Sequence, residues 1–128
     1  MKLYVAGAIS SDPDYVAHFA AGAEAVRQAG HEPALPPNLQ PDGYDHEAFM
    51  QEHKGATPMV VLREYLKVDL LCLLDCDGIA LLPTWLNSTG AKVERGVAMG
   101  VGLPVFFITN DYIKLRSLDD VSVEYANV

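Results

Sequence analysis

Residues 75–108 read DCDGIALLPTWLNSTGAKVERGVAMGVGLPVFFI, and this stretch decides the fold because it holds a complete strand–helix–strand unit. Two short apolar segments have the length of buried strands, and a hydroxyl-bearing cap between them precedes a segment with helical spacing of its apolar residues. The predicted elements are a strand Ile79–Leu82, a helix capped by Ser88 or Thr89 that extends to about Val101, and a strand Pro104–Ile108. Such a unit joins two parallel strands through a crossover helix.

The chain before this unit shows the same alternation. The predicted elements are a strand Lys2–Ala6, a helix that starts at Asp12–Pro13 and ends at Gly30, a short strand His31–Leu35, and a largely buried helix from Met59 to about Asp75 after the cap Thr57–Pro58. Alternating strands and helices predict an α/β fold, with a Rossmann-like or flavodoxin-like three-layer sandwich and a mainly parallel sheet of four to five strands. Asp45–His53 could add a helical turn, and Val121–Tyr125 could form a last edge strand.

Length and composition favour one domain over residues 1–128, since half of the residues are apolar and can form a core. The formal net charge of -8 disfavours nucleic acid and anionic membranes as partners. We interpret Cys72 and Cys76 as core thiols of a cytoplasmic protein, and we expect no signal peptide and no membrane span. The four histidines lack metal-ligand spacing, and we interpret them as surface or loop residues: His18, His31, His46 and His53.

Two acidic residues occupy positions where apolar side chains are expected. Glu94 falls near the middle of the apolar arc of its helix, and Asp69 lies among leucines on the preceding helix. Because burial of an unpartnered carboxylate is costly, each acid has either a function or a firm partner. A cap or an ion pair with Lys67, Arg63 or Arg95 would be such a partner. Two acids in unlike environments, one ionised and one protonated, also form the pair that cleaves glycosidic bonds.

Further polar groups follow the predicted strands, where ligands collect in open α/β sheets. Tyr4 lies two residues before the end of the first strand, and a buried carboxylate would suit its hydroxyl. The loop Gly7-Ala8-Ile9-Ser10-Ser11 and the segment Asn87-Ser88-Thr89-Gly90 each lead into a helix N-terminus, where backbone amides favour an anion. Capping alone explains Ser88 about as well. The chain has no complete dinucleotide-binding glycine pattern and no phosphate-loop motif.

Three spaced segments together resemble the nucleoside 2-deoxyribosyltransferase superfamily, which includes the 2′-deoxynucleoside 5′-monophosphate N-hydrolases and small, often phage-borne relatives. These segments are Leu3–Gly7, then Asp69 with Asp75–Ile79, and then Trp85–Glu94 continuing to Gly102–Val105. The resemblance implies that Glu94 captures the deoxyribosyl C1′ as a covalent ester, while Tyr4 orients Glu94 and Asp69 protonates the departing base. It also implies that the reaction needs no metal and no redox cofactor.

In the hydrolase branch, serines and backbone amides hold the 5′-phosphate, which corresponds here to Ser88 and to the loop Gly7–Ser11. Those hydrolases carry a serine and a nearby basic residue in the first loop, where this chain has Ala8 and Asp12. The insert 38–57 does not match the family, so base identity is not carried over. The resemblance also implies a homodimer in which each subunit completes the site of the other.

Three hypotheses for function follow. The first is an N-glycosidase that hydrolyses the base–sugar bond of a (deoxy)nucleoside 5′-monophosphate through a glycosyl-Glu94 intermediate. The second is a nucleoside 2-deoxyribosyltransferase, which exchanges bases through the same ester. The third is a non-catalytic module that binds a nucleotide in the same cleft. In each case the partner is a small-molecule nucleotide or nucleoside.

Overall fold

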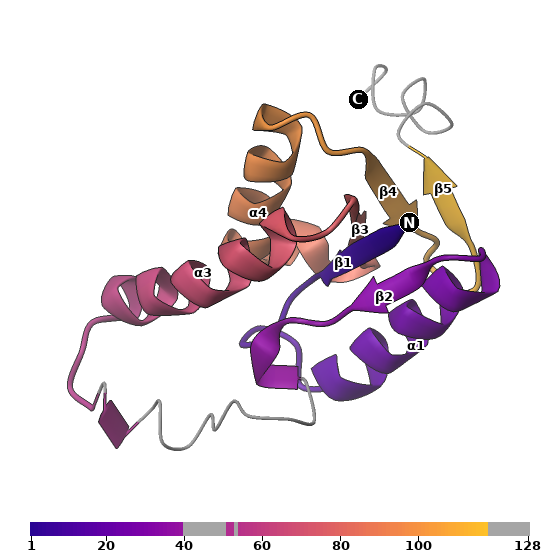
Figure 1. Cartoon of the computed structure of the whole chain (residues 1–128). Helices are drawn as coiled ribbons and strands as arrows, with labels where there is room; N and C mark the ends of the chain where they lie inside the picture. Colours follow the sequence, from indigo (N-terminus) through magenta and orange to yellow (C-terminus); the bar gives the residue numbers. More distant parts are fainter. Residues whose placement is uncertain (40–50, 53, 118–128) are drawn as a thin grey trace, which may run out of the picture.

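The computed structural model of the protein describes residues 1–39, 51–52 and 54–117 and contains a five-stranded sheet in the order β2-β1-β3-β4-β5 (Figure 1). Neighbouring strands from β2 to β4 are parallel, and β5 is antiparallel to β4. The elements are β1 Lys2–Ala6, α1 Tyr15–Gln28, β2 Glu32–Ala34, η1 Pro37–Leu39, α3 Pro58–Leu74, β3 Gly78–Leu81, η2 Pro83–Asn87, α4 Thr89–Gly100, β4 Val105–Ile108 and β5 Leu115–Ser117. The predicted α/β fold with a mainly parallel sheet is confirmed.

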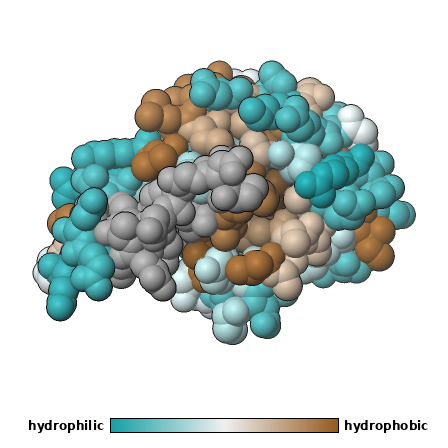
Figure 2. Space-filling view, turned by 60° about the horizontal axis from the view of Figure 1, so that its bottom comes forward, coloured by the Kyte–Doolittle hydropathy of each residue, from teal (hydrophilic) through white to brown (hydrophobic). Residues whose placement is uncertain are grey.

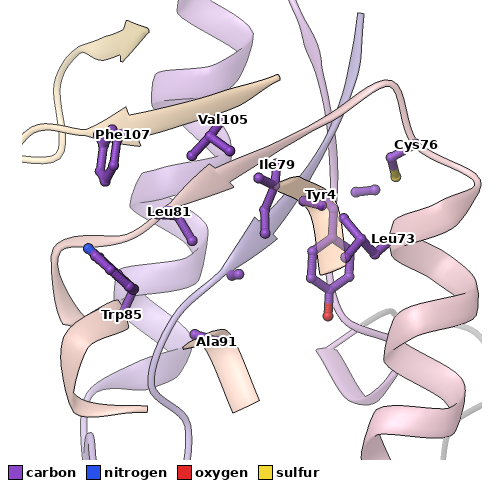
Figure 3. Close-up of a cluster of buried hydrophobic side chains, with 12 residues drawn as sticks. Tyr4, Leu73, Cys76, Ile79, Leu81, Trp85, Ala91, Val105 and Phe107 are labelled. Carbon is purple, nitrogen blue, oxygen red and sulfur yellow. The ribbon is translucent and has the colours of Figure 1, made fainter. Parts of the chain in front are cut away.

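Helices cover both faces of the sheet and complete a three-layer sandwich (Figure 1). Successive side chains of a strand point to opposite faces, and β1 is buried on both. Leu3 and Val5 pack against α1, whereas Tyr4 and Ala6 belong to the cluster that includes buried residues of α3 and α4. Figure 3 shows this second cluster, with Leu73 of α3 beside the ring of Tyr4. The alternation along β1 therefore decides which side chains face the site described below.

The start of α1 differs from the prediction. The helix begins at Tyr15, and its N-cap residue Asp14 forms no side-chain cap hydrogen bond. The carboxylate of Asp12 instead accepts a hydrogen bond from the backbone N–H of Asp14 and bonds the ring of His18. The predicted start at Asp12–Pro13 is therefore wrong, because the Asp12 side chain anchors a turn ahead of the helix and does not cap it. His18, interpreted as a surface or loop residue, is partly exposed on α1, and its ring bonds Asp12.

The prediction that α3 is largely buried is also wrong. Within this fully described helix Leu73 is the one buried residue. Four large apolar side chains of α3 are exposed, namely Met59, Val68, Leu71 and Leu74, with exposed fractions of 66%, 40%, 68% and 48%. The helix packs mainly against α4 and η1, so one side of it meets the protein and the other does not. An apolar composition on all sides predicts burial on all sides, and the sequence could not show that one layer of neighbours was missing.

The other predicted strands agree with the structure to within one residue, but β5 was not predicted. The predicted edge strand Val121–Tyr125 lies outside the described residues, and of the predicted turn Asp45–His53 only Gln51 and Glu52 are described. None of the helices in the described ranges has the length and apolar character needed to cross a membrane. Hydrophilic residues cover much of the face shown in Figure 2, with separate apolar patches between them.

Candidate active site

A cleft of about 360 Å³ lies next to Gly7, the first residue after β1, between α3 and the start of α4. One wall consists of the β1–α1 loop and the first turns of α4. The opposite wall is the inner side of α3, from Pro58 to Asp69. A cleft of this size at the carboxyl edge of a parallel sheet suits a single small-molecule ligand.

Glu94 lies on the inner face of α4 and lines the cleft. The buried residues of α4 are Ala91, Glu94 and Ala98, which are spaced three and four residues apart and therefore share one face of the helix. Glu94 is 5% exposed, and its Oε2 atom has no hydrogen-bond partner among the residues that the structure describes. Burial raises the pKa of Glu94 to about 8, an increase that Asp69 reinforces and the Tyr4 hydroxyl opposes. The site therefore holds a carboxyl group whose ionisation the fold makes costly.

Asp69 faces the same cleft from α3. It shares a stripe of the helix with Leu62, Tyr65 and the buried Leu73, at spacings of three and four residues. Desolvation by burial raises the pKa of Asp69 to about 7. Because Asp69 is only partly buried, ligand binding in the cleft would remove further water from it and favour its protonated form.

The ion pairs that the sequence suggested for Asp69 and Glu94 do not form within the described part of the chain. Lys67 binds Glu64, at 2.7 Å between Nζ and Oε1. The guanidinium of Arg95 lies over the ring of Trp85, with Cζ 5.1 Å from the ring centroid. Neither basic side chain is therefore committed to Asp69 or Glu94, which leaves both carboxyl groups available to a ligand.

Tyr4 is fully buried in β1, and Figure 3 shows its hydroxyl directed away from Val105 and Phe107. Its pKa lies well above the usual value, first because of burial and then because of the nearby Glu94 and Asp69. The interaction with the Tyr4 hydroxyl also lowers the pKa of Glu94. Tyr4 and Glu94 nevertheless form no hydrogen bond of standard geometry, since neither the Tyr4 hydroxyl nor Oε2 of Glu94 has a hydrogen-bond partner among the described residues. The three predicted catalytic residues thus lie within interaction range of one another.

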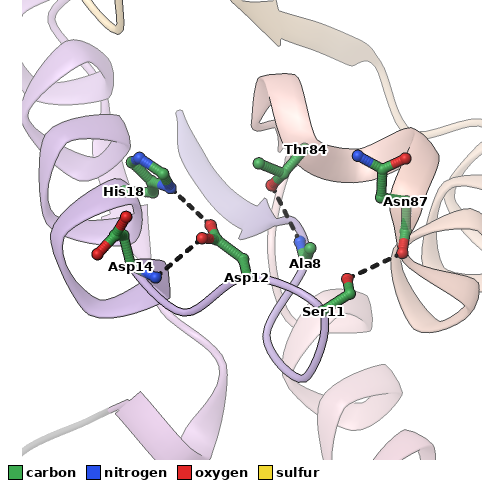
Figure 4. A network of polar contacts seen from close by, with 7 residues as sticks. All are labelled: Ala8, Ser11, Asp12, Asp14, His18, Thr84 and Asn87. Carbon is green, nitrogen blue, oxygen red and sulfur yellow. Dashed lines mark hydrogen bonds and ion pairs between the residues drawn. The ribbon is translucent and has the colours of Figure 1, made fainter.

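The β1–α1 loop contributes three of its predicted binding residues to the cleft, namely Gly7, Ile9 and Ser10. Ala8 is buried and does not line the cleft, and its N–H donates to Oγ1 of Thr84 at 3.1 Å (Figure 4). Gly7 has to be a glycine because a Cβ atom there would lie 2.7–3.0 Å from the side chain of Leu82. The loop therefore lies tightly against the residues that follow β3.

The start of α4 forms the other part of this wall. Ser88 is the N-cap, as predicted, and its hydroxyl accepts from the N–H of Ala91 at 3.0 Å. Ser88 and Gly90 both line the cleft. The hydroxyl of Ser11 donates to the backbone oxygen of Asn87 at 3.0 Å, which joins the loop to η2 directly before this cap (Figure 4).

The sequence reasoning missed two features of the site. Met59, Leu62 and Tyr65 line the cleft beside Asp69, and their helical spacing relative to Asp69 was the signal that could have revealed them. The second feature is the anchor beneath the loop, where His18 binds Asp12 and stacks on Tyr112 with ring centroids 5.0 Å apart. These side-chain contacts leave no periodic signal in the sequence. Across residues 1–39, 51–52 and 54–117, no group of three or more His, Cys, Asp or Glu side chains could hold a metal ion.

Comparison with known proteins gives one match. A family model described as "Domain of unknown function (DUF4406)" matches residues 1–107. No curated protein and no solved structure matches the chain. The matched residues include every residue that lines the cleft.

Proposed function

Because the chain belongs to the DUF4406 family, whose description states no activity, we propose from the geometry of the cleft that the protein is an N-glycosidase. Its reaction would cleave the base–sugar bond of a (deoxy)nucleoside or (deoxy)nucleotide. The observation that carries this proposal is the pair Asp69 and Glu94, two carboxyl groups without ion-pair partners among the described residues, facing one cleft with raised pKa values. Perturbed acids of this kind gather at catalytic sites.

The proposed reaction has two steps. In the first, an oxygen of Glu94 bonds to C1′ of the sugar, the C1′–N bond breaks, and Asp69 gives its proton to the departing base. In the second, water attacks C1′, its proton passes to Asp69, and Glu94 leaves as a carboxylate. Two displacements at one carbon retain its configuration, and the resemblance to the deoxyribosyltransferase superfamily supports the same assignment of roles.

This chemistry needs Glu94 ionised and Asp69 protonated, whereas in the empty cleft Asp69 has the lower pKa. Two features favour the productive arrangement. The Tyr4 hydroxyl is a donor placed to favour the carboxylate form of Glu94. A bound substrate would exclude water from Asp69, which is the more exposed of the two acids, and would raise the pKa of Asp69.

A panel assay tests the proposal. The protein is incubated with deoxynucleosides, ribonucleosides and their 5′-monophosphates, and the released base is measured by chromatography. We expect turnover by the wild type and by Glu24→Gln, a surface control on α1, and loss of turnover in Glu94→Gln. Mass spectrometry of the trapped intermediate should place the sugar on the peptide that contains Glu94. Binding of panel members without turnover, unchanged in Glu94→Ala, would refute the enzymatic proposal and favour a non-catalytic nucleotide-binding module.

A second candidate is base exchange through the same Glu94 ester, as in a deoxyribosyltransferase. The observation that favours it is the apolar part of the α3 wall, where Met59 and Leu62 line the cleft. Apolar side chains there would stack on a base and exclude water, so a second base could intercept the ester. Adding a free base to the panel assay distinguishes the two reactions, because exchange produces a new nucleoside and hydrolysis produces free sugar.

We also propose a homodimer formed through α3. A groove between α3 and α4 is lined by Met59, Leu62, Leu66 and Val93 with the aliphatic part of Arg63, and it is almost entirely apolar. Met59, Leu62 and Thr89 line both this groove and the cleft. A second copy seated on the groove would therefore bury exposed apolar residues and close the open side of the cleft with the same contact.

A further inference from the structure

We infer that the cleft accepts a nucleoside with a free 5′-hydroxyl and selects against a 5′-phosphate. This inference rests on the proposed function and narrows its substrate class. It is carried by the charges that line the cleft and by the hydrogen bonds that engage three donors in or beside its wall.

Lysine and arginine side chains are missing from the cleft. The chain has nine lysines and arginines, and all nine fall in the part that the structure describes, so they can be placed without exception: Lys2, Arg27, Lys54, Arg63, Lys67, Lys92, Arg95, Lys114 and Arg116. None of them lines the cleft. Arg63 lies in the outer groove, Lys67 binds Glu64, and Arg95 lies over Trp85. A phosphate dianion in the cleft would therefore meet no cationic side chain of its own chain at the walls that the structure describes.

The charged groups that do line the cleft are Asp69 and Glu94. At least one of them has to be ionised for the proposed reaction, so a phosphate bound beside them would be repelled during catalysis. A hydroxyl carries no charge and meets no such repulsion. The net charge of -8 further disfavours the binding of a phosphate dianion.

Three donors in or beside the segments that the sequence suggested for a phosphate are engaged within the protein. The N–H of Ala8 donates to Thr84, and the N–H of Ala91 donates to the Ser88 hydroxyl. The Ser11 hydroxyl donates to the backbone oxygen of Asn87. Binding a phosphate through these groups would require breaking bonds that hold the loop and the helix start in place.

The remaining polar groups at this wall suit a neutral hydroxyl. Ser10, Asn87 and Ser88 line the cleft and offer uncharged oxygen and nitrogen atoms. Ser88 accepts the bond from Ala91 and can still donate its own hydrogen. One or two neutral hydrogen bonds satisfy a sugar hydroxyl, whereas a dianion is usually bound by charge-assisted bonds from arginine, lysine or several amides.

The experiment compares each of the four deoxynucleosides with its own 5′-monophosphate. We measure kcat/KM with the wild type and Kd with Glu94→Gln, which should bind without turnover. We expect at least a tenfold preference for the nucleoside over its monophosphate in kcat/KM and in Kd. In Ser10→Lys, which places a cation in the cleft, this preference should fall at least tenfold. Gln28→Lys adds the same charge on the surface of α1 and should leave the preference unchanged.

Each outcome bears on the inference separately from the proposed function. Equal or better use of the monophosphates overturns the inference and leaves the glycosidase proposal standing. If nothing is cleaved, the proposed function fails, and the Kd ratio still decides: tighter nucleoside binding supports the selection, and equal or tighter monophosphate binding overturns it. Failure of both substrate classes to bind overturns the inference together with the proposed function.

Discussion

The hydroxyl of Tyr4 and Oε2 of Glu94 are both buried and lack hydrogen-bond partners among the described residues, yet each group shifts the pKa of the other. Burial of polar groups without a hydrogen bond costs free energy. We infer that this arrangement keeps the Glu94 carboxylate reactive until a substrate binds. The relationship also yields measurable consequences for stability and for rate.

Glu94→Gln should stabilise the fold at alkaline pH. The folded protein raises the pKa of Glu94 from the usual 4.5 to about 8, so between these values the folded state holds a proton that the unfolded state has lost. The stability of the wild type should therefore fall as the pH rises through this range, by a few kcal/mol, since one pKa unit is worth about 1.4 kcal/mol. Urea unfolding should show no benefit of Glu94→Gln near pH 4 and a large benefit at pH 9. The exposed Glu24→Gln should show no such gain, and an equal gain in both variants would contradict the assignment.

The rate of turnover should show a bell-shaped dependence on pH. Turnover needs one proton on the Asp69–Glu94 pair, and the two groups titrate together near pH 7 and pH 8. We expect kcat/KM to rise as the pH approaches about 7 and to fall above about 8. Asp69→Asn should lower kcat by roughly 10²- to 10⁴-fold, because it removes the proton donor for the departing base. A flat profile from pH 5 to pH 10 would refute the role of the pair.

Tyr4→Phe should slow the reaction while keeping the core packing. The ring remains, but the donor that lowers the pKa of Glu94 is lost, so the pH optimum should move upward. Because a hydrogen bond to a charged group is worth about 1.5–3 kcal/mol, kcat/KM should fall about 10- to 100-fold. Tyr112→Phe, on a tyrosine that does not line the cleft, is the matched control. An unchanged pH optimum in Tyr4→Phe would mean that the hydroxyl does not act on Glu94.

His18→Phe should destabilise the protein at neutral pH and not in strong acid. The hydrogen bond from His18 is the main cause that lowers the pKa of Asp12, so it contributes stability above the usual carboxyl pKa and loses it as the pH falls through the lowered value. Phenylalanine can keep the stacking on Tyr112. Thermal unfolding by circular dichroism should show a lower Tm at pH 7 and convergence with the wild type in strong acid, where Asp12 is protonated in both states. A constant difference at all pH values would assign the effect to packing.

Met59→Glu should dissociate the proposed homodimer. Met59 lines the groove and is 66% exposed on α3, and Val16 is 63% exposed on α1, so Val16→Glu is a control of matched exposure. Light scattering coupled to size exclusion should show a dimer for the wild type and for Val16→Glu, and a monomer for Met59→Glu. A monomeric wild type at all concentrations would refute the dimer.

The sequence predicted the features of the site that depend on local pattern. The apolar arc around Glu94 predicted its burial, and the position of Ser88 predicted its cap. It did not predict which side of α3 would be covered, since apolar residues occur all around that helix. Nor did it predict the contact between Asp12 and His18, because hydrogen bonds between side chains leave no periodic trace. β5 was not predicted because its sequence, Leu115–Ser117, contains one apolar residue only.

The hydrogen bonds from Ala8 to Thr84 and from Ser11 to Asn87 have a mechanical consequence. They brace the β1–α1 loop against η2, the segment that leads directly into α4. The opposite wall is the part of α3 from Pro58 to Asp69, and the single buried residue within the described length of this helix, Leu73, lies near its C-terminal end. Since α3 has fewer buried anchors than the braced loop, we expect a ligand that enters the cleft to displace α3 more than the β1–α1 loop.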